Sequence, residues 1–264
     1  MRRLFANIRR SLLESGRARK YLVYAIGEIA LVVIGILIAL QINTWNEARK
    51  NRILEQEYYC RLLGDVTQDD EQLVQLTSLA EARLQAANNA LRLLYKASPR
   101  KLDVGREIGQ AIRAIYADFT PNDAAFEDLK SGANLNIMRD KSVIKALNQY
   151  YNQVERYLSI IRINAEHAVA IYFAHADKFA NGWVHANALN EGWRLHMGME
   201  PDVLQTLAIT DEDLMTADMR SRLVNEALDY LSTSARHLEL YGFIQMEIDQ
   251  LTDILAKKCP DQGQ

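Results

Sequence analysis

The sequence predicts an all-α protein: one N-terminal transmembrane helix continues into the long stalk helix of an antiparallel helical-bundle ectodomain. Three observations lead to this prediction. Residues 21–42 form an apolar run that is long enough to cross a bilayer. Beyond it, apolar residues recur at three- and four-residue spacing over long stretches. The 264 residues include only four Pro and twelve Gly, which leaves little room for a turn-dense β-sheet fold.

The apolar run contains Glu28 as its only charged side chain. At the rise of an α-helix its 22 residues extend roughly 33 Å, about the thickness of a hydrocarbon core. Tyr21, Tyr24 and Trp45 flank it, and amphipathic rings of this kind prefer the membrane interface. Because no A-x-A-like cleavage site follows the run, we interpret it as an uncleaved anchor and not as a signal peptide.

Basic residues are unequally distributed about the anchor. Seven Lys and Arg residues precede it within residues 1–20, and four follow it at Arg49, Lys50, Arg52 and Arg61. Basic residues are retained on the cytoplasmic side, so we expect a cytoplasmic N-terminus and an external C-terminal domain. The predicted organisation is a basic cytoplasmic tail (1–20), a transmembrane helix (21–42), a helical-bundle extracytoplasmic domain (43–258) and a C-terminal tail (259–264).

Glu28, Gly35 and Ala39 lie on one stripe of the predicted transmembrane helix. An exposed carboxylate at this depth costs about 2 kcal/mol, and small residues let helices approach closely. We therefore expect this face to contact a second copy of the chain or a partner membrane protein. Two alternatives stay open. One is a lone helix whose Glu28 side chain reaches toward the cytoplasmic membrane interface. The other is an ion or proton pathway, although a single acidic residue does not form a proton relay.

The segment "YAIGEIALVVIGILIALQINTWNEARKNR", together with the preceding "SGRARKYLVY", resembles the N-terminal signature of a bacterial family of single-pass membrane proteins of unknown function. "AAFEDLKSGANLNIM", residues 124–138, is similar to a Ser-Gly-containing segment in the middle of such proteins, although Lys130 stands where a first Ser is usual. The resemblance implies location in the bacterial inner membrane, with the C-terminal domain in the periplasm. It implies no activity.

The stalk helix is predicted to continue from Trp45 to Lys96, where "ASPR" ends it. Its apolar residues form a heptad-like seam that Asp69 and Arg83 interrupt. The seam can meet other helices of its own bundle or form a coiled coil with an identical stalk, and we favour the intramolecular bundle. Further along we expect helices over 101–118, over a short segment that Thr120 caps and Ser131-Gly132 ends, over 139–180 and over 215–258.

The two cysteines, Cys60 and Cys259, fall near the start of the ectodomain and at the end of its last helix. An even number of bundle helices would bring both positions to the same end of the bundle. A disulfide between them is therefore one possibility in an oxidising compartment. Two unrelated thiols are the other, and two cysteines without a nearby His pair predict no zinc site.

Sequence motifs for catalysis are missing: the chain has no P-loop, GxGxxG, GxSxG or HExxH motif and no Glu-x-x-His pairs. We predict no catalytic residues, no metal site and no cofactor. Asp65, Asp69, Asp70 and Glu71 are interpreted as a solvated acidic face of the stalk. His167 and His175 are interpreted as satisfied histidines of the bundle.

The segment "NGWVHANALNEGWRLH" is the most unusual part of the ectodomain sequence. Its Trp183, His185, Trp193 and His196 could line a ligand pocket at the edge of the bundle, or the indoles could cover the end of the bundle. The net charge of −3 divides into +6 over residues 1–20, −1 at Glu28 and −8 beyond residue 44. An acidic ectodomain without a basic patch predicts no nucleic-acid partner.

Together these features predict a non-enzymatic, membrane-anchored protein that acts in protein–protein interaction or assembly in the bacterial envelope. The alternative is an extracytoplasmic small-molecule sensor that signals through lateral contacts of its transmembrane helix, an expectation that depends on fold analogy alone. An enzyme that uses His185 and His196 is the third hypothesis.

Overall fold

We describe a computed structural model that covers residues 17–132, 134–174, 200, 202 and 215–259. Regular structure in these residues is helical throughout, with five α-helices and one 3₁₀-helix and no strand. The chain divides into two units, one up to Gln56 and one from Glu57 onward. The predicted all-α class is confirmed.

The first unit contains the N-terminal part of α2 (Arg17–Leu94), a single helix of 78 residues. Side chains from Lys20 through Arg52 are exposed, apart from the half-buried Ala25 and Ala48. The most apolar 18-residue window has a mean hydropathy of 2.6, and none of it is buried. By length and composition, this is the one helix among the described residues that could cross a membrane. As predicted, α2 continues without a break from the apolar run into the stalk.

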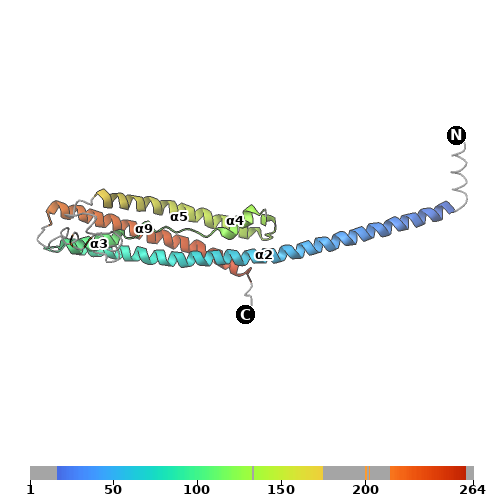
Figure 1. Cartoon of the computed structure of the whole chain (residues 1–264), viewed down its shortest axis with the longest axis horizontal. Coiled ribbons are helices and arrows are strands. Elements are labelled where there is room, and N and C mark those ends of the chain that lie inside the picture. The colour runs from blue at the N-terminus through green and yellow to red at the C-terminus, as the bar shows by residue number, and fades with distance from the viewer. Residues whose placement is uncertain (1–16, 133, 175–199, 201, 203–214, 260–264) are drawn as a thin grey trace, which may run out of the picture. The chain divides into compact units, whose positions relative to one another are not determined.

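The second unit is a bundle of four antiparallel columns (Figure 1). Residues 57–94 of α2 form the first column, α5 (Lys141–Ala174) the third and α9 (Ala217–Ala256) the fourth. The hydrogen bond from Gln149 to Glu247 and the ring contact of Tyr157 with Phe243 show that α5 and α9 run in opposite directions. Similarly, α9 runs opposite to α2, because Gln245 contacts Asp70 and Cys259 is bonded to Cys60.

The second column is composite. It contains α3 (Lys101–Ile112), an irregular segment, α4 (Ala124–Ser131) and the 3₁₀-helix η1 (Asn134–Asn136). Its order along α2 is antiparallel: Asn89 contacts Glu107 near one end, and Tyr58 contacts Asn134 near the other. With four columns, the chain returns to the end where residue 57 begins, as the even number of helices predicted.

Two predicted helix boundaries in this column are wrong. The helix predicted over 101–118 ends at Ile112, because Arg113 has an extended ψ of 131° and Ala114 has a φ of 53°. The short helix begins at Ala124, and its N-cap is Asp123 and not Thr120. The cap hydrogen bond comes from another helix, since Asp65 of α2 accepts from the backbone N–H of Ala125 at 2.9 Å. Sequence rules for capping consider only local residues, so they could not find this contact.

The core follows the predicted seam positions. Leu62, Val66, Leu73, Leu76 and Ala80 of α2 are buried, as are most of the periodic positions of α5 and α9. Ile144, Tyr151 and Leu238 are half-buried. Toward the end of α2 the core becomes rich in alanine, with Ala86, Ala87, Ala90, Ala111, Ala165, Ala168 and Ala227 in one apolar cluster. Such small side chains allow helices to pack closely. Between the leucine-rich and alanine-rich parts lie buried polar residues, which form the candidate site.

Candidate functional site

The predicted contact stripe of α2 is exposed. Glu28, Gly35 and Ala39 all have exposed side-chain positions, and a Cβ added to Gly35 would meet no other heavy atom within 4 Å. The structure thus leaves this face free of intrachain packing. Contact with another helix through the stripe remains a prediction.

The second predicted site lies outside the described residues: Trp183, His185, Trp193 and His196 all fall within 175–199. His175 lies there as well. His167 lies on α5 of the bundle and is exposed to solvent.

Cys60 and Cys259 form a disulfide, with their Cα atoms 5.0 Å apart. The sequence left open a disulfide or two separate thiols, and the structure contains the disulfide. It joins the start of the bundle part of α2 to the end of α9 across 199 residues of chain. In the chain-entropy model, closing a loop of this length stabilises the fold by about 5 kcal/mol.

The acidic segment of α2 is not simply a solvated face, which corrects the sequence interpretation. Asp69 is completely buried and accepts three hydrogen bonds, from Tyr150 Oη at 2.6 Å, Asn122 N at 2.8 Å and Asn122 Nδ2 at 2.9 Å. Asp70 accepts from Gln245 at 2.6 Å, and of the four acids Glu71 alone is exposed. Burial outweighs these hydrogen bonds and raises the pKa of Asp69 to about 6.

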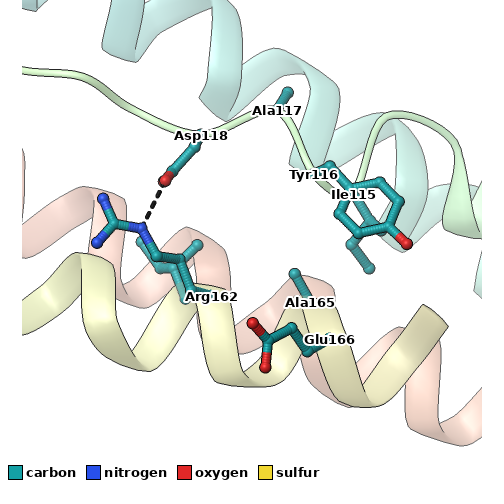
Figure 2. A pocket seen from close by; sticks show the side chains of 8 residues that line it. Ile115, Tyr116, Ala117, Asp118, Arg162, Ala165 and Glu166 are labelled. Atoms are coloured by element: carbon teal, nitrogen blue, oxygen red, sulfur yellow. Dashed lines mark hydrogen bonds and ion pairs between the residues drawn. The ribbon is translucent and has the colours of Figure 1, made fainter. Parts of the chain in front are cut away.

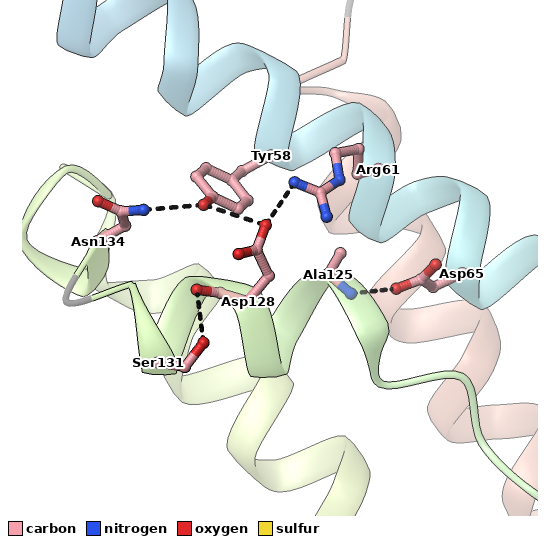
Figure 3. Close-up of polar contacts among 7 residues, drawn as sticks. All are labelled: Tyr58, Arg61, Asp65, Ala125, Asp128, Ser131 and Asn134. Carbon is pink, nitrogen blue, oxygen red and sulfur yellow. Dashed lines mark hydrogen bonds and ion pairs between the residues drawn. The ribbon is translucent and has the colours of Figure 1, made fainter.

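The neighbouring contacts attach α4 to α2 (Figure 3). Asp128 of α4 accepts from Arg61 Nη1 at 2.7 Å, and Asn134 donates to the hydroxyl of Tyr58 at 2.9 Å. Asp65 meets the N-terminus of α4, where its charge also complements the helix dipole. The polar side chains on this part of α2 are therefore used to hold the composite column, and each has protein partners.

A second buried polar group has different properties. We name it the Arg83 cluster, and it consists of Arg83 on α2, Asp118 in the irregular segment, and Ser234, His237 and Tyr241 on α9. Arg83 is 2% exposed, and its Nη1 donates to the carbonyl oxygen of Ala114 at 3.3 Å. The rings of His237 and Tyr241 lie 6.1 Å apart. The charge of Arg83 acts on both, and its guanidinium group also lies close to the hydroxyl group of Tyr241.

The electrostatics of the Arg83 cluster are dominated by burial. Burial, reinforced by the positive charge of Arg83, lowers the pKa of His237 to about 4, against smaller opposing effects of the Ile161 backbone and Asp118. The imidazole is therefore neutral near pH 7. Burial also raises the pKa of Tyr241, although the guanidinium of Arg83 opposes that shift. Burial lowers the pKa of Arg83, yet a guanidinium keeps its proton in proteins.

A surface pocket of about 230 Å³ adjoins this cluster (Figure 2). Apolar side chains of Ile115, Ile161 and Ala165 line part of it, and Asp118, Arg162 and Glu166 supply charge. Arg162 Nε donates to Asp118 Oδ2 at 2.7 Å. Asp118 thus belongs both to the pocket and to the Arg83 cluster. Nowhere in the described ranges do three His, Cys, Asp or Glu side chains gather as a metal site would require.

Most of these elements lie in a region that a protein-family model matches. A family of unknown function (DUF6090) matches residues 28–169, more than half of the chain. The chain belongs to this family. The family match confirms membership in an uncharacterised domain family, as the resemblance implied, whereas the transmembrane signature stays a prediction. No curated protein and no solved structure matches the chain.

The family match begins at Glu28 and ends near the end of α5. Within the DUF6090 region lie the contact stripe of α2, the Asp69 contacts, and Arg83 and Asp118 of the Arg83 cluster. Ser234, His237 and Tyr241 lie beyond it, on α9. The cluster therefore combines residues of the family region with residues of the C-terminal helix.

Sequence reasoning missed the Arg83 cluster, although part of its signal was visible. Arg83 interrupts the apolar seam of the stalk. Ser234 and Tyr241 fall in the apolar spacing of three and four residues along the last helix. A charged residue at a core position is costly unless something compensates it, so the interruption was itself evidence of a site. His237 follows Ser234 by three residues and shares its face, which the apolar pattern alone did not reveal.

Proposed function

We propose that the chain is a single-pass protein of the bacterial inner membrane, with a cytoplasmic N-terminus and its helical bundle in the periplasm. The support is the apolar part of α2, where the most hydrophobic window has no buried residue. Such a surface is costly in water and stable in lipid. The excess of basic residues ahead of Tyr21 favours the orientation, and the Cys60–Cys259 disulfide suits an oxidising compartment.

We further propose that it acts without catalysis, through assembly with itself or with a partner membrane protein. The exposed stripe of Glu28, Gly35 and Ala39 carries this proposal. In lipid the Glu28 carboxyl group gains from a hydrogen-bond partner on another helix, and Gly35 and Ala39 permit the close approach that this bond requires. Assembly through this face would place two bundles next to one another on the same side of the membrane.

Blue-native electrophoresis of the full chain in mild detergent tests the assembly. Gly35→Leu adds bulk on the stripe, and Ala30→Leu adds bulk on another face of the helix, about 140° from Gly35. We expect Gly35→Leu and Glu28→Ala to shift the complex to monomer, while Ala30→Leu leaves it unchanged. A wild-type chain that migrates as a monomer, or equal effects of both leucine variants, would contradict the proposal.

A second candidate function is small-molecule sensing, and the Arg83 cluster favours it. Six of its buried polar atoms have no hydrogen-bond partner, whereas the Asp69 carboxylate accepts three hydrogen bonds. A sensor of this type would signal through lateral contacts of α2. A ligand-dependent rise in melting temperature would support this function.

A further inference from the structure

Unpartnered buried polar atoms are concentrated at one place in the bundle. In the part of the chain that the structure describes, six buried side-chain nitrogen and oxygen atoms have no hydrogen-bond partner. All six belong to the Arg83 cluster: Arg83 Nε, Asp118 Oδ1, Ser234 Oγ, both ring nitrogens of His237 and Tyr241 Oη. Folded proteins satisfy most buried polar groups, so six exceptions in one cluster indicate that the site is built to bind something.

The charge of the cluster indicates what it binds. Arg83 is 2% exposed, and no carboxylate among the described residues forms an ion pair with it. The carboxylate of the cluster, Asp118, is instead paired with Arg162 at the surface. Buried charges in proteins are normally paired, because removing an isolated ion from water is very costly. Among the described residues, no negatively charged side chain therefore compensates the positive charge of the Arg83 guanidinium group.

The hydrogen-bond donors of the cluster also favour a negatively charged ligand. Arg83 Nε–H and the hydroxyl groups of Ser234 and Tyr241 are donors. These donors come from α2 and from successive turns of α9, and all three residues are buried. An oxygen-rich anion accepts several hydrogen bonds at once, and bonds to a charged acceptor are the stronger kind.

The neighbouring pocket lies between the cluster and solvent at Asp118. It shares Asp118 with the cluster and includes Ile161, whose backbone acts on the His237 ring. The side chains of the Arg162–Asp118 ion pair are 46% and 32% exposed, and exposed pairs contribute little stability. A small ligand could therefore pass this pair without large cost to the fold.

We propose that the Arg83 cluster is a binding site for a small oxyanion of the carboxylate type, which supplies the negative charge that the buried guanidinium lacks. Ordered water could satisfy the hydroxyl groups, but water would leave the charge of Arg83 uncompensated. The proposal does not depend on assembly through α2. The two are tested by different measurements on the same protein.

The experiment uses the full chain in detergent and follows its melting temperature and binding heat with sodium acetate and with sodium nitrate. Sodium chloride at equal ionic strength is the reference. Both oxyanions are expected to raise the melting temperature in a saturable way, relative to chloride. Nitrate shares the planar oxygen arrangement and lacks the methyl group, so a response to acetate alone would restrict the site to carboxylates.

Conservative variants locate the binding. Tyr241→Phe and Ser234→Ala each remove one donor and keep the packing, and we expect each to weaken anion binding about tenfold. Tyr95→Phe and Ser159→Ala change exposed positions and should bind as the wild type does. Arg83→Lys keeps the charge but loses the planar donor set, and circular dichroism checks that each variant is folded.

Two results would overturn the proposal. One is a wild-type chain whose melting temperature and binding heat respond to the oxyanions no more than to chloride. The other is an equal response in Tyr241→Phe, Ser234→Ala and the control variants, which would mean that the anions act elsewhere on the protein.

Discussion

The hydroxyl group of Tyr150 on α5 donates a hydrogen bond of 2.6 Å to Oδ2 of Asp69 on α2. This bond joins two columns of the bundle through groups that are both buried. The same carboxylate holds Asn122 of the composite column. One acidic residue in an apolar seam thus fixes three columns relative to one another, and removing it would leave partners on two of them unsatisfied.

The raised pKa of Asp69 predicts a pH-dependent stability. The folded pKa of about 6 exceeds the ordinary value of 3.8, so the folded state binds the proton more tightly than the unfolded state. This contribution is fully present below about pH 3.8 and is lost as the pH rises through 6, a change of about 3 kcal/mol. Urea unfolding of Asp69→Asn and wild type from pH 4 to 7 measures it. A difference between the two that stays constant across this range would contradict the prediction.

The cap that Asp65 provides for α4 predicts a moderate loss on truncation. Asp65→Ala removes the acceptor for Ala125 N and should lower the free energy of unfolding by about 1 kcal/mol. Glu71→Ala, at an exposed position on the same helix, should change it by less than about 0.5 kcal/mol. Urea unfolding compares the two. Equal effects would mean that the Asp65 contact contributes nothing to stability.

Gly132 and Gly64 predict opposite effects of alanine. At Gly132 an added Cβ would lie 2.7 Å from Asn134 Nδ2 and 3.0 Å from the Asp128 carbonyl oxygen. Gly132→Ala must displace Asn134 from Tyr58, and we expect a loss of about 1–2 kcal/mol. Gly64→Ala, where nothing lies within 4 Å, should stabilise α2 by about 0.5–1 kcal/mol. Thermal unfolding that ranks the two variants in the reverse order would refute this account.

The disulfide predicts sensitivity to reducing agents. Reduction of Cys60–Cys259 should lower the free energy of unfolding by about 5 kcal/mol if chain entropy governs the effect, and should lower the melting temperature accordingly. The double variant Cys60→Ser with Cys259→Ser should melt at the reduced temperature with or without reductant. A wild-type melting temperature that reductant does not change would show that the bond is not formed in the protein.

The sequence predicted the helical class, the continuity of α2 and the three long columns, because these depend on hydrophobic periodicity that Leu62, Val66 and Leu73 display directly. Sequence-based prediction gave wrong helix boundaries in the composite column. The end of α3 depends on the conformation of Ala114, and the start of α4 depends on Asp65, a residue 60 positions away in the chain. Hydrophobic periodicity reveals neither the backbone conformation of Ala114 nor the contact of Asp65 with Ala125.

The candidate site was harder to predict for the same reason. Arg83 and His237 come together only when α2 and α9 pack, and no spacing in the sequence relates them. The buried acid Asp69 was misread as solvated because three carboxylates surround it in the sequence, at positions 65, 70 and 71. Only its contacts with Tyr150 and Asn122 separate it from them.

Extraction of membranes with alkaline carbonate tests most directly the proposal that α2 anchors the bundle in a bilayer. Membranes from cells that express the full chain are washed with carbonate and separated by centrifugation, beside a variant without residues 21–42. We predict that the full chain stays in the membrane pellet and that the shortened variant is released. Release of the full chain into the supernatant would contradict the membrane anchor and the orientation and assembly proposed from it.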